Sequence, residues 1–162
     1  MRIVTTMVIS LCALAIGAQS QIVRSQPMIT ITHSGSRTAQ QAPADHFTGS
    51  AWVDPVLRTT GTEPAGAALV GFEPGARTAW HTHPLGQTLI VTDGVGWVQQ
   101  WGGPVEIIRK GDVVQIPPGV KHWHGATSST SMTHLAIVEA LDGKTVEWME
   151  KVSDVQYRGP QP

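Results

Sequence analysis

Five of the seven histidines in this 162-residue chain fall between positions 81 and 134, and their spacing suits metal chemistry. One residue separates His81 from His83, and one separates His122 from His124. In an extended strand the side chains alternate between two faces, so each pair would present both rings on one face. Imidazole is the commonest protein ligand for metals. The spacing therefore predicts a metal site built from two strands.

Gln87 and His134 extend the candidate site beyond these two pairs. A bend at Pro84 and Gly86 would return Gln87 to the face that carries His83. Three imidazoles and one amide oxygen would leave open positions on a six-coordinate ion for water or substrate. Because an amide is neutral, the ion would keep its full positive charge and act as a stronger Lewis acid. These ligands therefore favour polarising a hydroxyl or carbonyl oxygen over stabilising an oxidised metal.

His124 and His134 offer a second kind of chemistry, because imidazole titrates near neutral pH. His124 shares a strand face with His122 and would point into the same space. His134 stands alone in an apolar segment, where a hydrogen-bonded core histidine is the alternative to a functional one. If both rings reach the metal site, they can move a proton to or from a bound group.

The elements that must position these residues are short strands. Turn signals separate apolar or alternating segments, which lie at 67–72, 88–91, 95–101, 105–108, 113–116, 120–125, 132–139 and 145–148. An earlier run from Phe47 to Val53 alternates and is stopped by Pro55, and a turn is expected at Thr92-Asp93-Gly94. Short strands with turns at regular intervals predict an all-β sandwich or barrel.

The chain divides into four parts. Residues 1–20 predict a signal peptide, with a positive start at Arg2, a short apolar run and a small-residue cleavage site at Ala18-Gln19-Ser20. A retained anchor is the alternative, although the apolar run is too short to span a bilayer. An N-terminal arm follows at 21–45 and includes a strand-like Met28–Thr32. Residues 46–150 form the barrel, and 151–162 are a tail with room for one helical turn.

Charge and cysteine content exclude several classes of partner and chemistry. The formal charge of −1 gives no basic field for nucleic acid. Cys12 is the only cysteine and would leave with the signal peptide, so the mature chain would have no thiol chemistry or disulfide. We therefore expect an exported protein, periplasmic or secreted, that binds a small molecule and, after removal of the signal, no membrane.

Two spaced motifs resemble the signature of the cupin superfamily, whose fold is a double-stranded β-helix or jelly-roll barrel. The first is Gly75-x5-His81-x-His83-x3-Gln87-x6-Gly94, and the second is Gly111-x5-Pro117-x-Gly119-x2-His122. The resemblance covers residues 46–150. The family usually carries glutamate where this chain has Gln87, and asparagine where it has Ala126. The first difference touches the metal site directly.

Longer runs, Phe72–Thr92, Lys121–Ala126 and Met132–Ile137, resemble small bacterial cupins related to manganese-dependent hydroxynitrile lyases and to carboxymuconolactone-decarboxylase-associated cupins. That resemblance implies one divalent metal per chain, manganese with iron or zinc as alternatives, held by His81, His83, Gln87 and His122. It places His124 and His134 beside the open coordination position as catalytic residues. It also implies a homodimer or homotetramer.

The resulting hypothesis is a metal-dependent cupin lyase that cleaves or forms cyanohydrins. The apolar part of the substrate would contact a pocket lined by Ala68, Val70, Leu89 and Val138. Two alternatives keep the same metal site: a metal-dependent dioxygenase or other oxidoreductase, and a module that binds a small molecule without turning it over. Arg77, Trp80 and Trp123 are assigned outside the cavity, with Arg77 as a surface or dimer residue, and His33 and His46 are assigned to the surface.

Overall fold

The structure is a computed structural model that describes residue 26 and residues 28–158. The predicted signal peptide at 1–20 lies outside the described residues. The chain divides after Ile31, and the residues from Thr32 onward form one unit. The strand expected at Met28–Thr32 is wrong, since no strand is formed there and Met28 and Ile29 are exposed. An alternating pattern alone does not make a strand where no second strand pairs with it.

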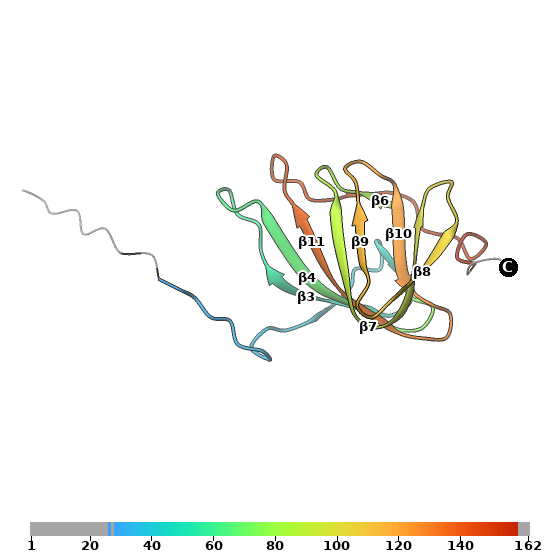
Figure 1. The fold of residues 1–162 in the computed structure, drawn as a ribbon, viewed down its shortest axis with the longest axis horizontal. Coiled ribbons are helices and arrows are strands. Elements are labelled where there is room, and N and C mark those ends of the chain that lie inside the picture. Colours follow the sequence, from blue (N-terminus) through green and yellow to red (C-terminus); the bar gives the residue numbers. More distant parts are fainter. Residues whose placement is uncertain (1–25, 27, 159–162) are drawn as a thin grey trace, which may run out of the picture. The chain divides into compact units, whose positions relative to one another are not determined.

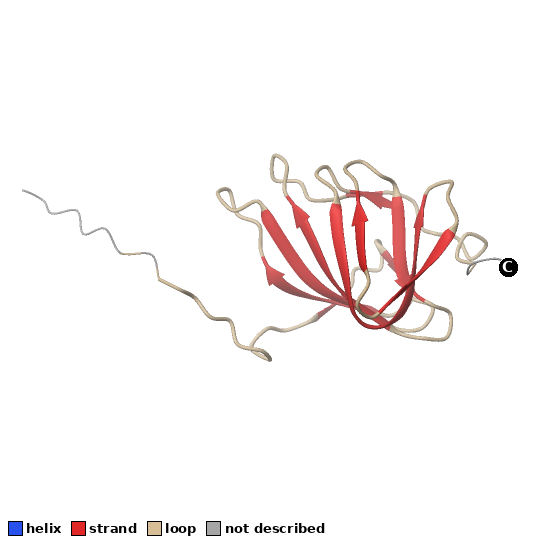
Figure 2. Cartoon of the chain, viewed as in Figure 1, coloured by secondary structure: helices blue, strands red, loops and turns tan. Residues whose placement is uncertain are grey.

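The described part of the chain contains twelve strands and no helix. Figure 1 shows the arrangement of the strands, and Figure 2 shows that loops join them. The all-β prediction is confirmed. The strands are β1 (Gln40–Gln41), β2 (Phe47–Thr48), β3 (Ala51–Leu57), β4 (Ala65–Phe72), β5 (Arg77–Thr78), β6 (His81–Thr82), β7 (Gln87–Gln100), β8 (Val105–Arg109), β9 (Val113–Ile116), β10 (His122–Ala126), β11 (Met132–Glu139) and β12 (Glu147–Trp148). Among the described residues, no helix is long and apolar enough to cross a membrane.

The long strand β7 joins two groups of antiparallel strands. Its first half pairs with β9 and β11, and the pairing continues through β4 and β3 to β1. Its second half pairs with β8 and β10, and β10 pairs in turn with β5 and β6. Figure 1 shows β3, β4, β11, β7 and β9 side by side in one curved layer. Two sheets that share one bent strand enclose the interior in which the histidines lie.

The turn expected at Thr92-Asp93-Gly94 is a bend inside β7 and not a break between two strands. Thr133 pairs with Asp93 and His134 pairs with Val91, so Thr92 is an extra residue in the ladder. Such a β-bulge bends the strand and increases its twist. Gly94 follows with φ of 75°, which favours glycine. The bend carries β7 from one sheet to the other.

Pro55 does not stop its strand as the sequence had indicated. It lies inside β3 and pairs with Ala68 of β4. The neighbouring strand β1 reaches only Trp52 and Val53, so the other edge of β3 is unpaired at the proline. Proline lacks an N–H group and is tolerated in a strand where no ladder bond is needed.

Arg77 is buried, so its assignment to the surface was wrong. The residue is 5% exposed, and Nη2 donates to the carbonyl oxygen of Val152 at 3.0 Å and to the carboxylate of Asp154 at 2.6 Å. The guanidinium lies 4.3 Å from the centre of the Tyr157 ring. These contacts hold the C-terminal segment against the sheet, where Val152 packs in a cluster with Trp80 and Trp123. The two tryptophans accordingly lie outside the cavity described below. A single hydrogen-bonded turn ends the segment, from Ser153 to Tyr157.

We predict that Gly94→Ala lowers the free energy of unfolding by about 3 kcal/mol or more, because a left-handed backbone strains alanine and the new methyl group overlaps the Ser131 carbonyl. Gly102→Ala is the matched control: Gly102 has φ of 78° and nothing within 4 Å of the added carbon, so only the backbone strain of about 1 kcal/mol remains. Urea unfolding measures both variants. Equal losses would show that the close approach at Ser131 does not matter.

Candidate metal centre

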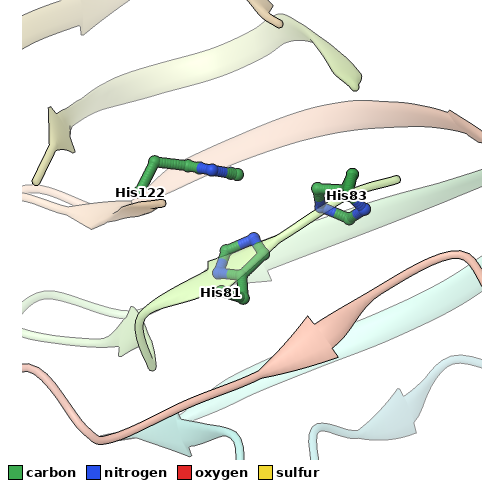
Figure 3. Close-up of side chains that lie close together, drawn as sticks. All are labelled: His81, His83 and His122. Atoms are coloured by element: carbon green, nitrogen blue, oxygen red, sulfur yellow. The ribbon is translucent and has the colours of Figure 1, made fainter. Parts of the chain in front are cut away.

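Three histidines from neighbouring strands converge on one point. His81 in β6 is the antiparallel partner of His122 in β10, and His83 follows β6 directly. Their candidate ligand nitrogens all lie within 4.8 Å of one another, and all three residues are buried. Figure 3 shows the three rings gathered in the space between these segments. The structure therefore brings together the three imidazoles that the spacing had singled out.

Each of these rings is fixed by its Nδ1 atom. Every Nδ1 lies within hydrogen-bonding distance of a backbone carbonyl oxygen, which accepts only, so Nδ1 must carry the proton. The three distances are 2.9 Å from His81 to Ala79, 2.5 Å from His83 to Thr145 and 2.9 Å from His122 to Val120. Each Nε2 is consequently an unprotonated acceptor. This tautomer is the one that a metal-ligating histidine needs.

Gln87 completes the donor set, and its position fits a cation. Its Oε1 lies 3.1 Å from Nε2 of His122, so two acceptors face each other without a proton to share. Nε2 of His83 is buried and has no hydrogen-bond partner among the described residues. Burial lowers the pKa of His81 well below its usual value, and repulsion from His122 lowers it further. Burial also lowers the pKa of His122 to about 4. Neutral imidazoles with inward lone pairs fit a divalent transition metal, which would satisfy all of them.

His124 and His134 form a second, separate pair. Nε2 of His134 lies 3.1 Å from Nδ1 of His124, and both side chains are buried. Nε2 of His124 and Nδ1 of His134 have no partner among the described residues. The His124 ring is 5.3 Å from the His81 ring, measured between centroids, so the pair lies beside the three-histidine cluster. Burial lowers the pKa of His134 to about 4 and that of His124 well below its usual value. Two neutral rings can share only one proton between these facing nitrogens.

A cavity of about 550 Å³ opens onto both groups of histidines. Its inner end is formed by His81, His83, Gln87, His124 and His134. The predicted pocket residues Ala68, Val70 and Val138 line its apolar wall. Leu89 does not line the cavity, contrary to the prediction. It lies on the same face of β7 as Gln87, but it is completely buried between Ala136 and Val114 of the adjacent strands.

Sequence reasoning missed three residues of the cavity wall. His46, assigned to the surface, stacks on Trp148 with ring centres 4.6 Å apart, and Trp148 in turn lies 4.7 Å from the His81 ring. Thr78 lines the cavity and is 1% exposed. His46 and Trp148 lie far from the histidine motifs in sequence, and no local pattern marks them. Thr78 precedes His81 by three residues, and in a continuous strand residues three apart lie on opposite faces. Alternation alone therefore did not place Thr78 beside His81.

An antiparallel β-fold that gathers three histidines and a glutamine in its interior places the chain among β-barrels whose interior could hold a metal ion. The sequence model of the cupin domain family matches residues 68–138 of this chain. A crystal structure of a cupin-like protein from Thermotoga maritima is 41% identical, with a TM-score of 0.72 over 78% of this chain and 96% of that one. The chain belongs to the cupin superfamily.

Two further comparisons concern a related lyase and a second solved structure. An (R)-mandelonitrile lyase from Granulicella tundricola is 59% identical over 128 residues, which make up 79% of this chain and 98% of the relative. A polyketide cyclase from Streptomyces resistomycificus is 16% identical, with a TM-score of 0.64 over 80% of this chain and 91% of that one. The second likeness concerns the fold alone. The resemblance to cupins related to hydroxynitrile lyases is therefore confirmed.

We predict that the protein binds one divalent transition metal per chain and that His81→Ala and His122→Ala each lose it, because each removes one of three converging nitrogens. His33→Ala, at an exposed position away from the cavity lining, should retain the metal. Mass spectrometry of the folded proteins gives the metal content. Full loading of both ligand variants would remove the site assignment.

A further prediction concerns the pH dependence of stability in chelator-treated protein. The pKa of His134 is about 4 in the folded chain and about 6.5 when unfolded. Above pH 6.5 the His134 imidazole is neutral in both the folded and the unfolded state, so its titration does not lower the free energy of unfolding. Between pH 6.5 and 4 only the unfolded state binds the proton. The free energy of unfolding therefore decreases as the pH is lowered, by on the order of 3 kcal/mol for this group. Urea titrations should show a shallower fall for His134→Leu, and an identical slope would contradict the assignment.

Proposed function

We propose that this protein is a metal-dependent lyase that cleaves cyanohydrins to an aldehyde and hydrogen cyanide, and forms them in reverse. The observation that carries the proposal is the buried His124–His134 pair beside the three-histidine cluster at the inner end of an apolar cavity. The 59% identity to a mandelonitrile lyase supports the same reaction class.

The residues that would hold the metal are His81, His83, His122 and Gln87, with manganese as the expected ion and iron or zinc as alternatives. A divalent ion held there would act as a Lewis acid on a substrate oxygen. All four ligands are neutral, and the described lining of the cavity contains no aspartate or glutamate. Nothing from the protein offsets positive charge at this point, which favours polarising a hydroxyl or carbonyl group.

The histidine pair would handle the proton that the reaction moves. Cleavage requires a base for the cyanohydrin hydroxyl, and the C–CN bond then breaks with its electron pair going to cyanide, which takes up a proton. Nε2 of His124 has no protein partner, and the centre of the His124 ring lies 5.3 Å from that of His81 and 5.8 Å from that of His122, so this nitrogen would accept the hydroxyl proton. His134 would share the resulting charge through the 3.1 Å contact between the two rings. The proton then returns to the departing cyanide, so the pair ends each cycle neutral.

The cavity wall would bind the organic part of the substrate. Gly66, Ala68 and Val70 from β4 and Ala136 and Val138 from β11 form an apolar floor of small residues. Ala68 and Ala136 are direct partners across the ladder. Because each side chain is a single methyl group, neither projects far into the space. Such a floor leaves room for an aromatic or branched aldehyde portion and keeps water from the inner end.

We predict that metal-loaded protein releases benzaldehyde from mandelonitrile above the uncatalysed background, equally with and without oxygen. His134→Ala should keep the metal and the fold but lose about 10²-fold or more of the rate, as expected for loss of proton-transfer assistance. Absorbance of benzaldehyde follows the reaction, and metal content is measured on the same samples. His33→Ala, at an exposed position away from the cavity lining, is the matched control.

Other outcomes would point to the other functions of this fold. Turnover that stops without oxygen, whatever the state of His134, would indicate a dioxygenase. Binding without turnover under manganese, iron and zinc would indicate a binding module, and the lyase proposal would then be wrong.

A further inference from the structure

Thr78 is a polar residue at the inner end of the cavity that the proton chemistry above does not use. It ends the short strand β5 and is 1% exposed, yet it borders the cavity together with His81 and His124. Its backbone pairs with Phe47 of β2 on one side. The residue is therefore fixed in place from its main chain.

The hydroxyl group of Thr78 has a free proton. Its oxygen accepts the backbone N–H of His124 at 3.2 Å and so acts as the next acceptor in the β5–β10 ladder, which ends at the pairing of Arg77 with Gly125. Within the described residues this is the only hydrogen bond of the Thr78 side chain. A hydroxyl has one proton to donate as well as lone pairs to accept, so the donor remains unused. A buried donor without a partner costs free energy unless a ligand or water accepts it.

Besides its hydroxyl oxygen, a cyanohydrin carries a second hydrogen-bond acceptor, the nitrile nitrogen. In the proposed function, the substrate oxygen would be polarised by the ion that the four ligands would hold, and its proton would go to the His124–His134 pair. The nitrile nitrogen accepts but cannot donate, so it requires a donor. The three ligand histidines direct their N–H groups at backbone carbonyls and have none to offer. Three residues with a hydroxyl group line the described cavity, namely Thr59, Thr78 and Thr145, and Thr78 is the one whose side chain contacts the backbone of His124.

We propose that the Thr78 hydroxyl donates a hydrogen bond to the nitrile nitrogen of the bound substrate, an inference that rests on the proposed lyase function. As the C–CN bond breaks, its electron pair moves onto cyanide, so the acceptor becomes more negative and the bond strengthens. A donor that binds the transition state better than the ground state accelerates the reaction. Thr78 is thus a catalytic residue that selects nitriles among the ligands of the cavity.

The test compares two probes that differ only in the acceptor. Phenylacetonitrile carries the nitrile and has no hydroxyl to cleave, whereas 3-phenyl-1-propyne has the same shape with an alkyne C–H in place of nitrogen. Calorimetry on metal-loaded wild type, Thr78→Val and Thr78→Ser gives the six affinities. Wild type should prefer the nitrile, and Thr78→Val should lose about three- to tenfold affinity for it alone, the range expected for one hydrogen bond. Thr78→Ser keeps the hydroxyl and should keep the preference.

Each other outcome overturns the inference. Equal losses for both probes in Thr78→Val would mean that Thr78 only supports the His124 backbone, because valine also removes the acceptor for that N–H. Wild type that binds both probes alike, or neither, has no nitrile donor at this position. If the valine variant does not fold, Thr78→Ala takes its place. Absence of mandelonitrile turnover would sink the lyase proposal separately, since the preference for nitrile over alkyne is measured without any turnover.

Discussion

The candidate site depends on one constraint, which is the direction of the Nδ1 atoms of three histidines. A backbone carbonyl accepts from each of them, which fixes the ring and leaves every Nε2 unprotonated toward a common point. Those carbonyls belong to strand ends and loops, so the site requires the antiparallel register that pairs His81 with His122. That register requires β10 to pair at the same time with the second half of β7. The bulge in β7 therefore helps to position the three-histidine cluster, although it lies outside the candidate site.

Burying the candidate site also costs folding free energy, which the rest of the fold must offset. Five imidazoles are buried, and burial is the leading cause of the lowered pKa of each one. Neutral rings without partners, such as Nε2 of His83, lose their hydration without a compensating bond. Two apolar clusters flank the site, one around Phe72 and Met132 and one around Trp80 and Trp123. Together they supply the packing that holds the converging acceptors in place.

The sequence predicted what local pattern determines and missed what long-range packing determines. The strand at 132–139 has the predicted bounds, and period-two alternation brought His81, His83 and His122 together because each lies in or beside an extended segment. Continuity of β7 could not be predicted, because a glycine with positive φ serves a bulge as well as a turn. The burial of Arg77 depends on Val152 and Asp154, which are far along the chain. Contacts of that kind have no periodic signal.

One strand presents two histidines that are alike in sequence and different in chemistry. His122 and His124 share a face of β10, and burial lowers the pKa of both. The difference is the partner of Nδ1: for His122 it is the carbonyl oxygen of Val120, which can never supply a proton, and for His124 it is the imidazole of His134, which can. A ring bonded to a carbonyl is held in one tautomer and suits a ligand. A ring bonded to a second imidazole can change tautomer as its outer nitrogen gains or loses a proton, and so suits proton transfer. In the proposed function, the different partners of Nδ1 are the reason for assigning His122 to metal binding and His124 to acid–base chemistry.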